Sequence, residues 1–348
     1  MHRHKHLFEQ VVSFENVLAA AREALRGKRW REPGASFYAD LERQVVDLQA
    51  ELSGEVYRPG DYHYFRIHEP KERLVAAAPF RDRVVHHAIV RVIQPIFERR
   101  FIEDSYASRP GKGTHAAMRR ASQFARRFDY ALKCDVQKYF PSIDHGVLMS
   151  LVSRVIGDDR LLALITTVLV THHDRVRQEW SSGGDLFDVR LHKCGLPIGN
   201  LTSQFFANVY LNALDHFVKH ELRVKGYLRY LDDFLLYGDD RRRLKEQGQR
   251  VKDKLASLHL CMHPDKYRLL HTRSGVDFVG FVVRRDGRIR VRAATARRYQ
   301  AKFRAMRWEV GQGRLPAATL TTSVRAWVAH TKHAQSVGLR RAVLSRRR

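Results

Sequence analysis

The amino-acid sequence predicts an α+β protein in which a small antiparallel sheet is backed by helices. Three observations lead to this fold class. Residues 226–238 have the pattern of a β-hairpin, because two runs rich in Tyr, Leu and Phe flank a pair of aspartates. Short strand-like segments occur at 62–67, 130–135 and 276–283. The longer segments between them carry apolar residues at helical spacing.

The composition combines ordinary apolar content with a strong positive charge. The 348 residues suffice for two or three packed units, and 63 Lys plus Arg against 37 Asp plus Glu give a formal net charge of +26. Such a charge attracts polyanions. Nucleic acid fits better than an anionic membrane, because the chain has no amphipathic anchor and no 18-residue apolar run. We therefore expect nucleic acid as partner and no membrane.

The compartment is predicted from the first residues and from the cysteines. The N-terminus lacks an apolar signal core, so the sequence indicates no export. The three cysteines have no Cys-x-x-Cys spacing, which favours a reducing cytosol and argues against a disulfide framework or a zinc site. We expect a cytoplasmic protein.

The N-terminal part is predicted to be helical and suggests no chemistry. Apolar residues recur at helical spacing over residues 7–53, with a break at 31–34. Alternation at 62–67 and a return at 73–78 then predict two strands around the polar turn 69–72.

Two helices are expected next, at 80–101 and 114–127. A basic glycine-containing loop, residues 105–115, opens the second one. Exposed amides in such a loop could hold phosphate or nucleic-acid backbone, and a plain helix N-terminus explains the same residues equally well.

The middle of the chain begins with a strand that ends at Asp135. Helices are expected over 147–172, and an exposed loop or hairpin over 173–190. A tight Gly/Pro loop at 194–204 leads into an apolar helix. The small residues of this loop would let a base pair approach the backbone, which is compatible with an ordinary capped helix start.

The C-terminal part is predicted to be a charged helix, a strand pair and a basic helical lobe. The helix covers 241–258, and the strand pair lies within 276–283. From Gly287 to the end there are 16 Lys or Arg and one acidic residue, Glu309. A charge run is often only a solvated face, but this imbalance favours a lobe lying along a nucleic-acid backbone.

The paired aspartates Asp232 and Asp233 are the leading candidates for chemistry, because they stand at the predicted tip of an apolar hairpin. Successive strand residues point to opposite faces, so one carboxylate would face a metal site and the other would support it. A buried carboxylate needs a cation or hydrogen bonds, and Mg²⁺ takes one or two carboxylates with phosphate oxygens and water. Asp135 adds a carboxylate from a separate strand, as two-metal phosphoryl transfer requires.

The order of these motifs resembles that of reverse transcriptases, over roughly residues 60–285. The strand ending in Asp135, with Phe140 five residues later, looks like the first carboxylate motif of the family. The Tyr-Leu-Asp-Asp box is similar to its second carboxylate motif. Lys266 falls where the family has its lysine motif, and Val279-Gly-Phe falls at its primer-grip hairpin. Arg73 and the 109–115 loop look like the fingers motifs of bacterial members.

The resemblance implies a right-hand polymerase with an antiparallel palm sheet, a fingers lobe and an α-helical thumb. Its expected parts are an N-terminal helical extension, fingers, a palm containing a helical insertion at 146–192, and a basic helical thumb. These would cover residues 1–60, 61–130, 131–285 and 286–348, respectively.

The resemblance also assigns roles to individual residues. It implies two Mg²⁺ ions held by Asp135 and Asp232, with the Val136 carbonyl as a further ligand, Asp233 supporting the site and Lys266 protonating pyrophosphate as general acid. Binding of the dNTP would involve Arg73, Lys71, Phe140, Ile198, Gly199 and Gln204. Template and primer would contact Arg109, Lys112, Tyr230, Gly280, Phe281, Arg297, Lys302 and Arg304. The alternatives are a surface strand residue for Arg73, a solvated lysine for Lys266 and a core aromatic for Phe140.

The loop around Gly199 resembles that of diversity-generating retroelements. Many reverse transcriptases have Gln before this glycine, whereas this chain has Ile198, and Ser203-Gln204 follow. The resemblance implies copying of a template RNA into cDNA with misincorporation opposite adenine, followed by mutagenic retrohoming into a variable-protein gene. It implies a basic, oligomeric accessory variability protein as partner, in a bacterial or phage-infected cell. Loss of the amide would loosen base selection, because discrimination by apolar contact is modest.

Two alternatives remain at this point. One is a retron-type or group II intron-type reverse transcriptase, and the other is a non-catalytic RNA-binding protein on a polymerase fold. The three aspartates argue against the second. The chain ends soon after the thumb-like lobe without room for a DNA-binding or endonuclease domain, which argues against the intron type, and it also has no room for an RNase H domain.

Overall fold

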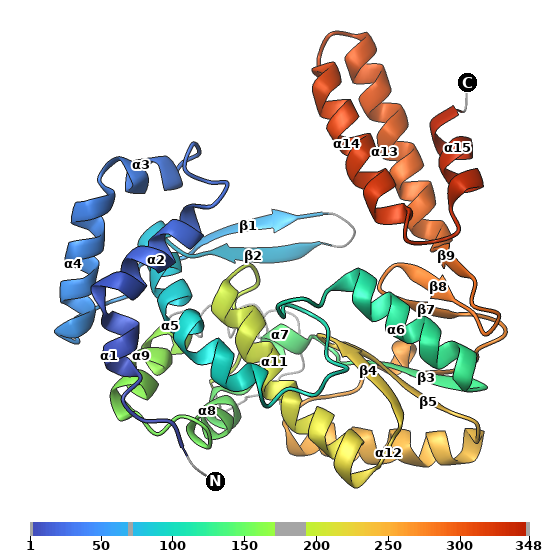
Figure 1. The fold of residues 1–348 in the computed structure, drawn as a ribbon, viewed down its shortest axis with the longest axis horizontal. Coiled ribbons are helices and arrows are strands. Elements are labelled where there is room, and N and C mark those ends of the chain that lie inside the picture. The colour runs from blue at the N-terminus through green and yellow to red at the C-terminus, as the bar shows by residue number, and fades with distance from the viewer. Residues whose placement is uncertain (1–2, 69–71, 171–192, 346–348) are drawn as a thin grey trace, which may run out of the picture. The chain divides into compact units, whose positions relative to one another are not determined.

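The computed structural model describes residues 3–68, 72–170 and 193–345. The chain forms two compact units, each built from separate stretches of sequence. The first contains residues 1–103, 136–216 and 252–261, and the second contains residues 104–135, 217–251 and 262–348. Figure 1 labels the elements of both units. The α+β fold class is confirmed, because helices and antiparallel sheets occur together in the same chain.

In its described residues, the first unit is mainly helical and contains one two-stranded sheet. Its helices are α1 (Phe8–Val12), α2 (Phe14–Leu25), α3 (Gly34–Ala39), α4 (Leu41–Ser53), α5 (Phe80–Glu98), α7 (Tyr139–Ser142), α8 (His145–Ser153), α9 (Asp159–Val170) and α11 (Leu201–His216). Its strands are β1 (His63–Ile67) and β2 (Arg73–Ala77), which pair antiparallel. The long helix α5 packs against α2 and α11. The predicted N-terminal helices and the 62–78 strand pair are therefore present, and the predicted 173–190 loop lies outside the described residues.

Local sequence explains where helices of this unit begin. Ser13 caps α2, because its hydroxyl accepts a hydrogen bond from the Asn16 amide at 3.3 Å. Asp144 caps α8 through its carboxylate, which accepts from the Val147 amide at 3.0 Å. Helix α5 begins directly after Pro79, because the extended backbone of Pro79 lies outside the helical conformation.

The second unit is built around two antiparallel sheets. The larger sheet has the strand order β4-β5-β3-β6, formed by Gly226–Tyr230, Asp233–Gly238, Tyr130–Asp135 and Arg268–His271. The smaller sheet has the order β7-β8-β9, formed by Val276–Phe278, Phe281–Val283 and Ile289–Val291. The predicted strand pair at 276–283 is thus a three-stranded sheet. Its last strand occupies residues that we expected to be helical, because Ile289 and Val291 alternate with arginine and pair with β8.

Helix α6 (Thr114–Arg127) joins the two sheets of the second unit. It contacts β4 of the larger sheet and β7 and β8 of the smaller one. Its buried face carries Ala117, Met118, Ala121 and Phe124, which recur at helical spacing. These side chains form one core with apolar residues of both sheets, among them Leu228, Leu235, Phe278 and Phe281.

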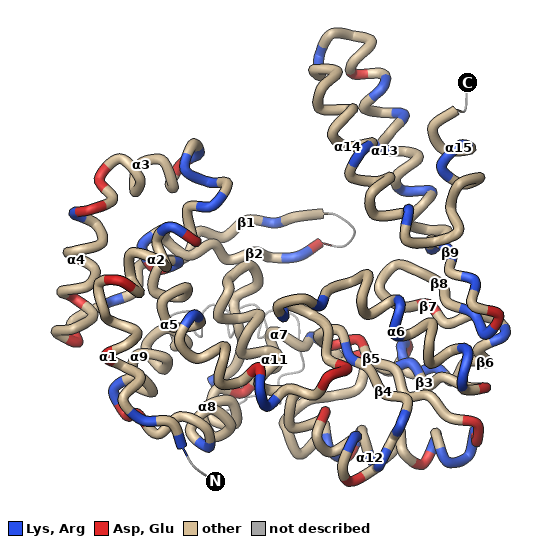
Figure 2. The backbone as a smooth tube through the Cα atoms, in the orientation of Figure 1, with Lys and Arg blue, Asp and Glu red and all other residues tan. Residues whose placement is uncertain are grey.

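The other described helices lie before, between and after these strands in the sequence. They are η1 (a π-helical turn, Phe217–Glu221), α12 (Arg241–Ser257), η2 (a 3-10 turn, Pro264–Lys266), α13 (Ala293–Gly311), α14 (Ala317–Thr331) and α15 (Val337–Ser345). Helices α13–α15 pack together with α13 in contact with both others, and Figure 2 shows Lys and Arg along them with few acidic positions. Among the described residues, no helix is both long enough and apolar enough to cross a bilayer.

Candidate active site

Two of the three candidate carboxylates face each other across the larger sheet. Asp135 is the last residue of β3 and Asp233 is the first residue of β5, and the two are direct partners in the antiparallel register. Residues paired in this way project from the same face of a sheet. The structure therefore brings together carboxylates that lie about 100 residues apart in sequence, as two-metal chemistry requires.

The hairpin that carries Asp232 differs in detail from the prediction. We expected Asp232 and Asp233 together at its tip. The tip is instead Leu231-Asp232, because Leu231 takes the left-handed conformation (φ 54°) and Asp233 already pairs with Tyr230. Asp233 is consequently a strand residue, and Asp232 is the turn residue beside it. We predicted that one of these two carboxylates faces a metal site while the other supports it. Their different positions, one in the turn and one in the strand, are compatible with that prediction.

Two lysines contact the carboxylates. The Lys266 Nζ lies 2.7 Å from Asp135 Oδ1, and Asp135 is only 7% exposed. The Lys133 Nζ lies 3.6 Å from Asp233 Oδ2 and donates to the Asp277 carbonyl at 2.7 Å. Sequence reasoning selected Lys266 and missed Lys133. The signal was present, because a lysine two residues before Asp135 in an apolar strand must share its face.

Burial raises the pKa of the Asp233 carboxyl to about 7. Lys133 counteracts this shift, while the charges of Asp135 and Asp232 add to it. The Asp233 Oδ1 atom is buried and has no hydrogen-bond partner among the residues that the structure describes. Negative charge is thus concentrated at this edge of the sheet, and a cation there would relieve it.

The chemistry of these donors fits magnesium. In the described ranges no three His, Cys, Asp or Glu side chains are grouped closely enough to hold a metal ion by themselves. Magnesium does not need such a group, because it is commonly held by one or two carboxylates and completed by substrate phosphates and water. Val136, whose carbonyl we expected to be a further ligand, follows Asp135 directly, and its side chain is buried.

The described nucleotide-binding candidates lie in the first unit, and two of them, Ile198 and Phe140, are connected through loop 196–200. The Ile198 carbonyl accepts a hydrogen bond from the Ala76 amide of β2 at 3.0 Å. The Phe140 carbonyl accepts one from the Leu196 amide at 2.9 Å, and the Phe140 side chain is partly buried. Loop 196–200 is therefore attached both to β2 and to the segment after β3 that carries Phe140.

Gly199 occupies a position that only glycine fits. Its φ is 116°, and an added Cβ would lie 2.9 Å from Val75 Cγ1 of β2. The buried Asn200 strengthens the same junction, since its Nδ2 donates to the Ala76 carbonyl at 3.0 Å. Sequence reasoning missed Asn200, which stands between the predicted residues Gly199 and Gln204. Gln204 is exposed on the first turn of α11.

Of the two side chains predicted to bind the triphosphate, the structure describes Arg73 but not Lys71. Arg73 is the first residue of β2, pairs in register with Ile67 and is exposed. This is the position of a surface strand residue, and it also leaves the guanidinium accessible to a ligand. Lys71 lies outside the described residues.

The predicted template and primer contacts fall into different environments. The Tyr230 hydroxyl lies 3.1 Å from Thr114 Oγ1, at the start of α6. Arg109 donates to the Ser105 carbonyl at 2.9 Å within the basic loop, and the Lys112 ammonium lies 5.3 Å from the Tyr106 ring centroid. Exposed positions on α13 are occupied by Arg297, Lys302 and Arg304.

Contrary to our prediction, the structure does not place Phe281 as a contact for template and primer. Its side chain is completely buried and packs against His330, with ring centroids 4.9 Å apart, so it is a core residue rather than a surface contact. Gly280 before it has φ 89° and no atom within 4 Å of the place where a Cβ would stand, so the main chain of this turn is open to a ligand.

Comparison with known proteins gives the family. Residues 67–283 match the family model described as reverse transcriptase (RNA-dependent DNA polymerase). Protein YkfC of Escherichia coli (strain K12) is 25% identical over 371 residues, which cover 88% of this chain and 92% of YkfC. The group II intron-encoded protein LtrA of Lactococcus lactis subsp. cremoris is 27% identical over 182 residues, covering 51% of this chain and 28% of LtrA. Nuclear intron maturase 1, mitochondrial, of Arabidopsis thaliana is 32% identical over 164 residues, covering 41% and 23%.

Among solved structures, telomerase from Candida albicans in complex with a telomeric RNA fragment aligns with a TM-score of 0.44 at 15% identity. The alignment covers 68% of this chain and 46% of that chain, a likeness too distant to support an argument. This chain spans nearly all of YkfC but only about a quarter of the two intron-related relatives. The family model covers more than half of the 348 residues, including both carboxylate motifs. The chain therefore belongs to the reverse transcriptase family, the RNA-dependent DNA polymerases.

Proposed function

We propose that this chain copies RNA into DNA by phosphoryl transfer at the edge of the larger sheet where β3 ends and β5 begins. The observation that carries the proposal is the pairing of Asp135 with Asp233, with Asp232 in the adjoining turn. The substrates are a template RNA, a primer or growing cDNA, and dNTPs. In the reaction the primer 3′-oxygen bonds to the α-phosphorus of the dNTP, and pyrophosphate leaves.

Two Mg²⁺ ions, when bound, supply a lowered pKa for the primer 3′-hydroxyl and neutralise charge on the leaving pyrophosphate. Asp135, Asp232 and the Val136 carbonyl would hold them. Asp233 supports the site by its charge, and Lys133 fixes that carboxylate in place. Lys266 would deliver a proton to pyrophosphate, and its ammonium already lies against Asp135.

Nucleotide selection is assigned to the loop at 196–200 and its neighbours. Phe140 would lie under the deoxyribose, where a ring excludes a 2′-hydroxyl. Arg73 and Lys71 would hold the triphosphate, because guanidinium groups suit bidentate phosphate contacts. Arg297, Lys302 and Arg304 on α13, with Arg109, Lys112, Tyr230 and the main chain at Gly280, would follow the template and primer.

We further propose that the enzyme belongs to a diversity-generating retroelement. Ile198 supports this, since an apolar residue there offers no hydrogen bond to the incoming base and apolar discrimination is modest. The proposal includes misincorporation at template adenines, mutagenic retrohoming into a variable-protein gene, and a basic oligomeric accessory variability protein. It places the reaction in the cytoplasm of a bacterial or phage-infected cell.

A group II intron-type reverse transcriptase is the second candidate. It is favoured by the relatives, whose names include a group II intron-encoded protein and a nuclear intron maturase. The two candidates predict different error spectra, because only the first requires loose selection opposite adenine.

The test is cDNA synthesis by the purified chain on a primed RNA, followed by sequencing of the products. Substitutions concentrated at template adenines support the retroelement type, and uniformly faithful cDNA supports the intron type. In the Ile198→Gln variant the adenine-specific error rate should change, with Val46→Gln, a change at an exposed apolar residue far along the sequence, as control. An unchanged spectrum in Ile198→Gln contradicts the role of this residue. Absence of cDNA even with cognate RNA and accessory protein contradicts the polymerase proposal.

A further inference from the structure

Arg229 is among the largest completely buried side chains in the described part of the chain. A guanidinium stays charged at every physiological pH, and a buried charge is costly unless its donors are satisfied. Arg229 lies in β4, immediately before the Tyr-Leu-Asp-Asp box. The contacts of this side chain therefore indicate what its burial achieves.

The guanidinium holds the turn that carries Asp232. Its Nη1 donates to the Leu231 carbonyl at 3.1 Å, and its Nη2 donates to Ser105 Oγ at 3.2 Å. Leu231 has φ 54°, a conformation that a leucine rarely adopts and that the surroundings must maintain. The hydrogen bond to its carbonyl supplies such a restraint directly before Asp232.

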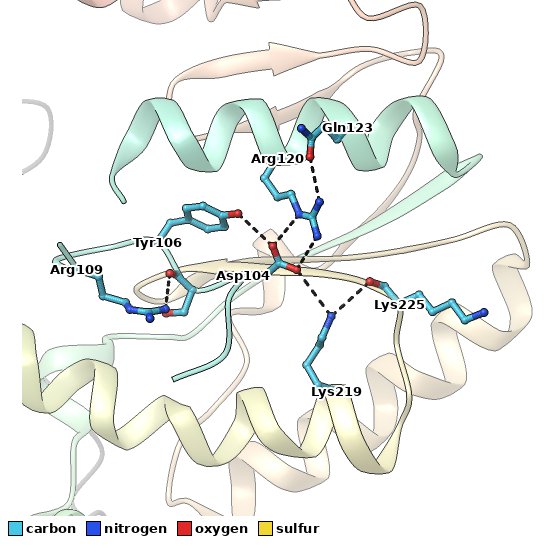
Figure 3. A network of polar contacts seen from close by, with 8 residues as sticks. Asp104, Tyr106, Arg109, Arg120, Gln123, Lys219 and Lys225 are labelled. Atoms are coloured by element: carbon cyan, nitrogen blue, oxygen red, sulfur yellow. Dashed lines mark hydrogen bonds and ion pairs between the residues drawn. The ribbon is translucent and has the colours of Figure 1, made fainter. Parts of the chain in front are cut away.

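Ser105 belongs to a segment that is itself firmly fixed. The Arg229 amide donates to the Asp104 carbonyl at 2.9 Å, and the Tyr106 amide donates to the Arg229 carbonyl at 3.0 Å. The Asp104 carboxylate is buried and accepts from Arg120 Nε at 2.8 Å and from the Tyr106 hydroxyl at 3.1 Å. Figure 3 shows this network, in which Arg120 reaches Asp104 from α6. The turn is thus connected to α6 through Ser105.

Arg229 acts from the side of the hairpin away from the paired carboxylates. In the β4–β5 register Arg229 is opposite Phe234, whereas Tyr230 is opposite Asp233. Neighbouring residues of a strand point to opposite faces, so Arg229 and Asp233 project to different sides. A direct contact of Arg229 with substrate is therefore not part of its role.

We propose that Arg229 is a positioning residue for the polymerase reaction, which holds the Leu231-Asp232 turn through the Leu231 carbonyl and Ser105. This inference rests on the proposed function. This restraint acts from behind the hairpin and orients Asp232 for metal binding. Without the guanidinium the turn fluctuates, so the carboxylate is placed for metal and primer only part of the time.

The test compares Arg229→Lys and Ser105→Ala in the full chain. Lysine keeps the charge but cannot reach two acceptors in a fixed plane, and Ser105→Ala removes one acceptor while leaving the guanidinium. The matched control is Thr272→Val, which removes another buried hydroxyl of the same unit, hydrogen-bonded to the Phe128 carbonyl and away from the hairpin.

We expect Arg229→Lys to lower kcat by about 10- to 100-fold, the size of effect that a misplaced group causes. The half-saturating Mg²⁺ concentration should rise, while KM for dNTP and the affinity for primed RNA stay unchanged. Two readouts need no turnover: Mn²⁺ binding measured by electron paramagnetic resonance should weaken, and amide exchange at 230–233 should accelerate. Ser105→Ala should shift all four quantities in the same direction by less, and Thr272→Val should shift none of them.

Other outcomes contradict the proposal in distinct ways. If Arg229→Lys lowers only the thermal midpoint, with kcat, metal dependence and amide exchange at the turn unchanged, Arg229 is a core residue without a positioning role. If Arg229→Lys does not fold, Ser105→Ala carries the test, and an Mg²⁺ dependence identical to that of Thr272→Val overturns the proposal. A parent chain without polymerase activity refutes the proposed function instead, and the exchange and Mn²⁺ measurements still decide the role of Arg229.

Discussion

Gly199→Ala is expected to destabilise the first unit strongly, and the structure gives the size of the effect. The backbone at this position has φ 116°, which in a residue with a Cβ costs about 1–3 kcal/mol. The added methyl would lie 2.9 Å from Val75 Cγ1, and overpacking of this kind costs about 1–3 kcal/mol. Together these two terms predict a loss of roughly 2–6 kcal/mol in the free energy of unfolding.

A double-mutant cycle separates the two terms. Val75→Ala removes the atom that the new methyl would meet, so it should restore the steric part, about 1–3 kcal/mol. It cannot restore the backbone part. Because loop 196–200 is bonded to β2 through Ala76, we also expect Gly199→Ala to raise KM for dNTP.

The assay is urea unfolding of the parent, both single variants and the double variant, followed by fluorescence and circular dichroism. A cost below about 0.5 kcal/mol for Gly199→Ala, the range of an ordinary surface substitution, would refute the conformational argument. Absence of coupling between positions 75 and 199 would refute the steric one.

Two further changes test the electrostatic account of the interior. Burial, with smaller contributions from His87 and Arg83, lowers the pKa of His86 to about 3, so the native chain keeps His86 neutral while the unfolded chain binds a proton below about pH 6.5. The stability contributed by neutral His86 is complete above pH 6.5 and falls by up to about 1.4 kcal/mol per pH unit below it. His86→Gln should therefore flatten the dependence of the free energy of unfolding on pH, whereas His63→Gln, a change at an exposed histidine, should not. Equal slopes for these two variants in urea titrations at pH 5–7 would contradict the assignment. Asp104→Asn weakens the charged hydrogen bonds from Arg120 and should cost about 1–3 kcal/mol. The exposed pair of Asp47 with Arg43 serves as comparison, since Asp47→Asn should change stability by less than about 0.5 kcal/mol, and similar values for both variants would count against the network in Figure 3.

The local sequence pattern was sufficient to predict the central hairpin and the elements next to it. The strand 130–135 and the helix 114–127 have the predicted bounds, because each has a clear period and a sharp end: Asp135 and Pro141 for the strand, and Gly113 for the start of the helix. The hairpin 226–238 was also predicted correctly, but its turn was displaced by one residue. The carbonyl of the left-handed Leu231 accepts a hydrogen bond from Arg229, whose guanidinium also donates to Ser105, and a contact with a residue as distant as Ser105 is invisible to local propensity.

The polar partners of the candidate site were harder to predict than its carboxylates. Asp232 and Asp233 stand out because aspartates are unusual between apolar strands. Lys133 and Arg229 look like ordinary strand residues until the register shows what each faces, Asp233 for Lys133 and the turn carbonyl for Arg229. Phe281 shows the opposite error, since its place in a family motif suggested a contact but the fold buries it completely.

The central claim is that Asp232 belongs to a metal-dependent polymerase site, and one comparison tests it most directly. Primer extension on RNA is measured for the parent and for Asp232→Ala with dNTPs and Mg²⁺, and again after chelation of the metal, with thermal midpoints confirming that both chains are folded. We predict cDNA from the parent only when Mg²⁺ is present, and none above background from Asp232→Ala. Equal extension by the two folded chains would contradict the account and leave this fold with a binding role.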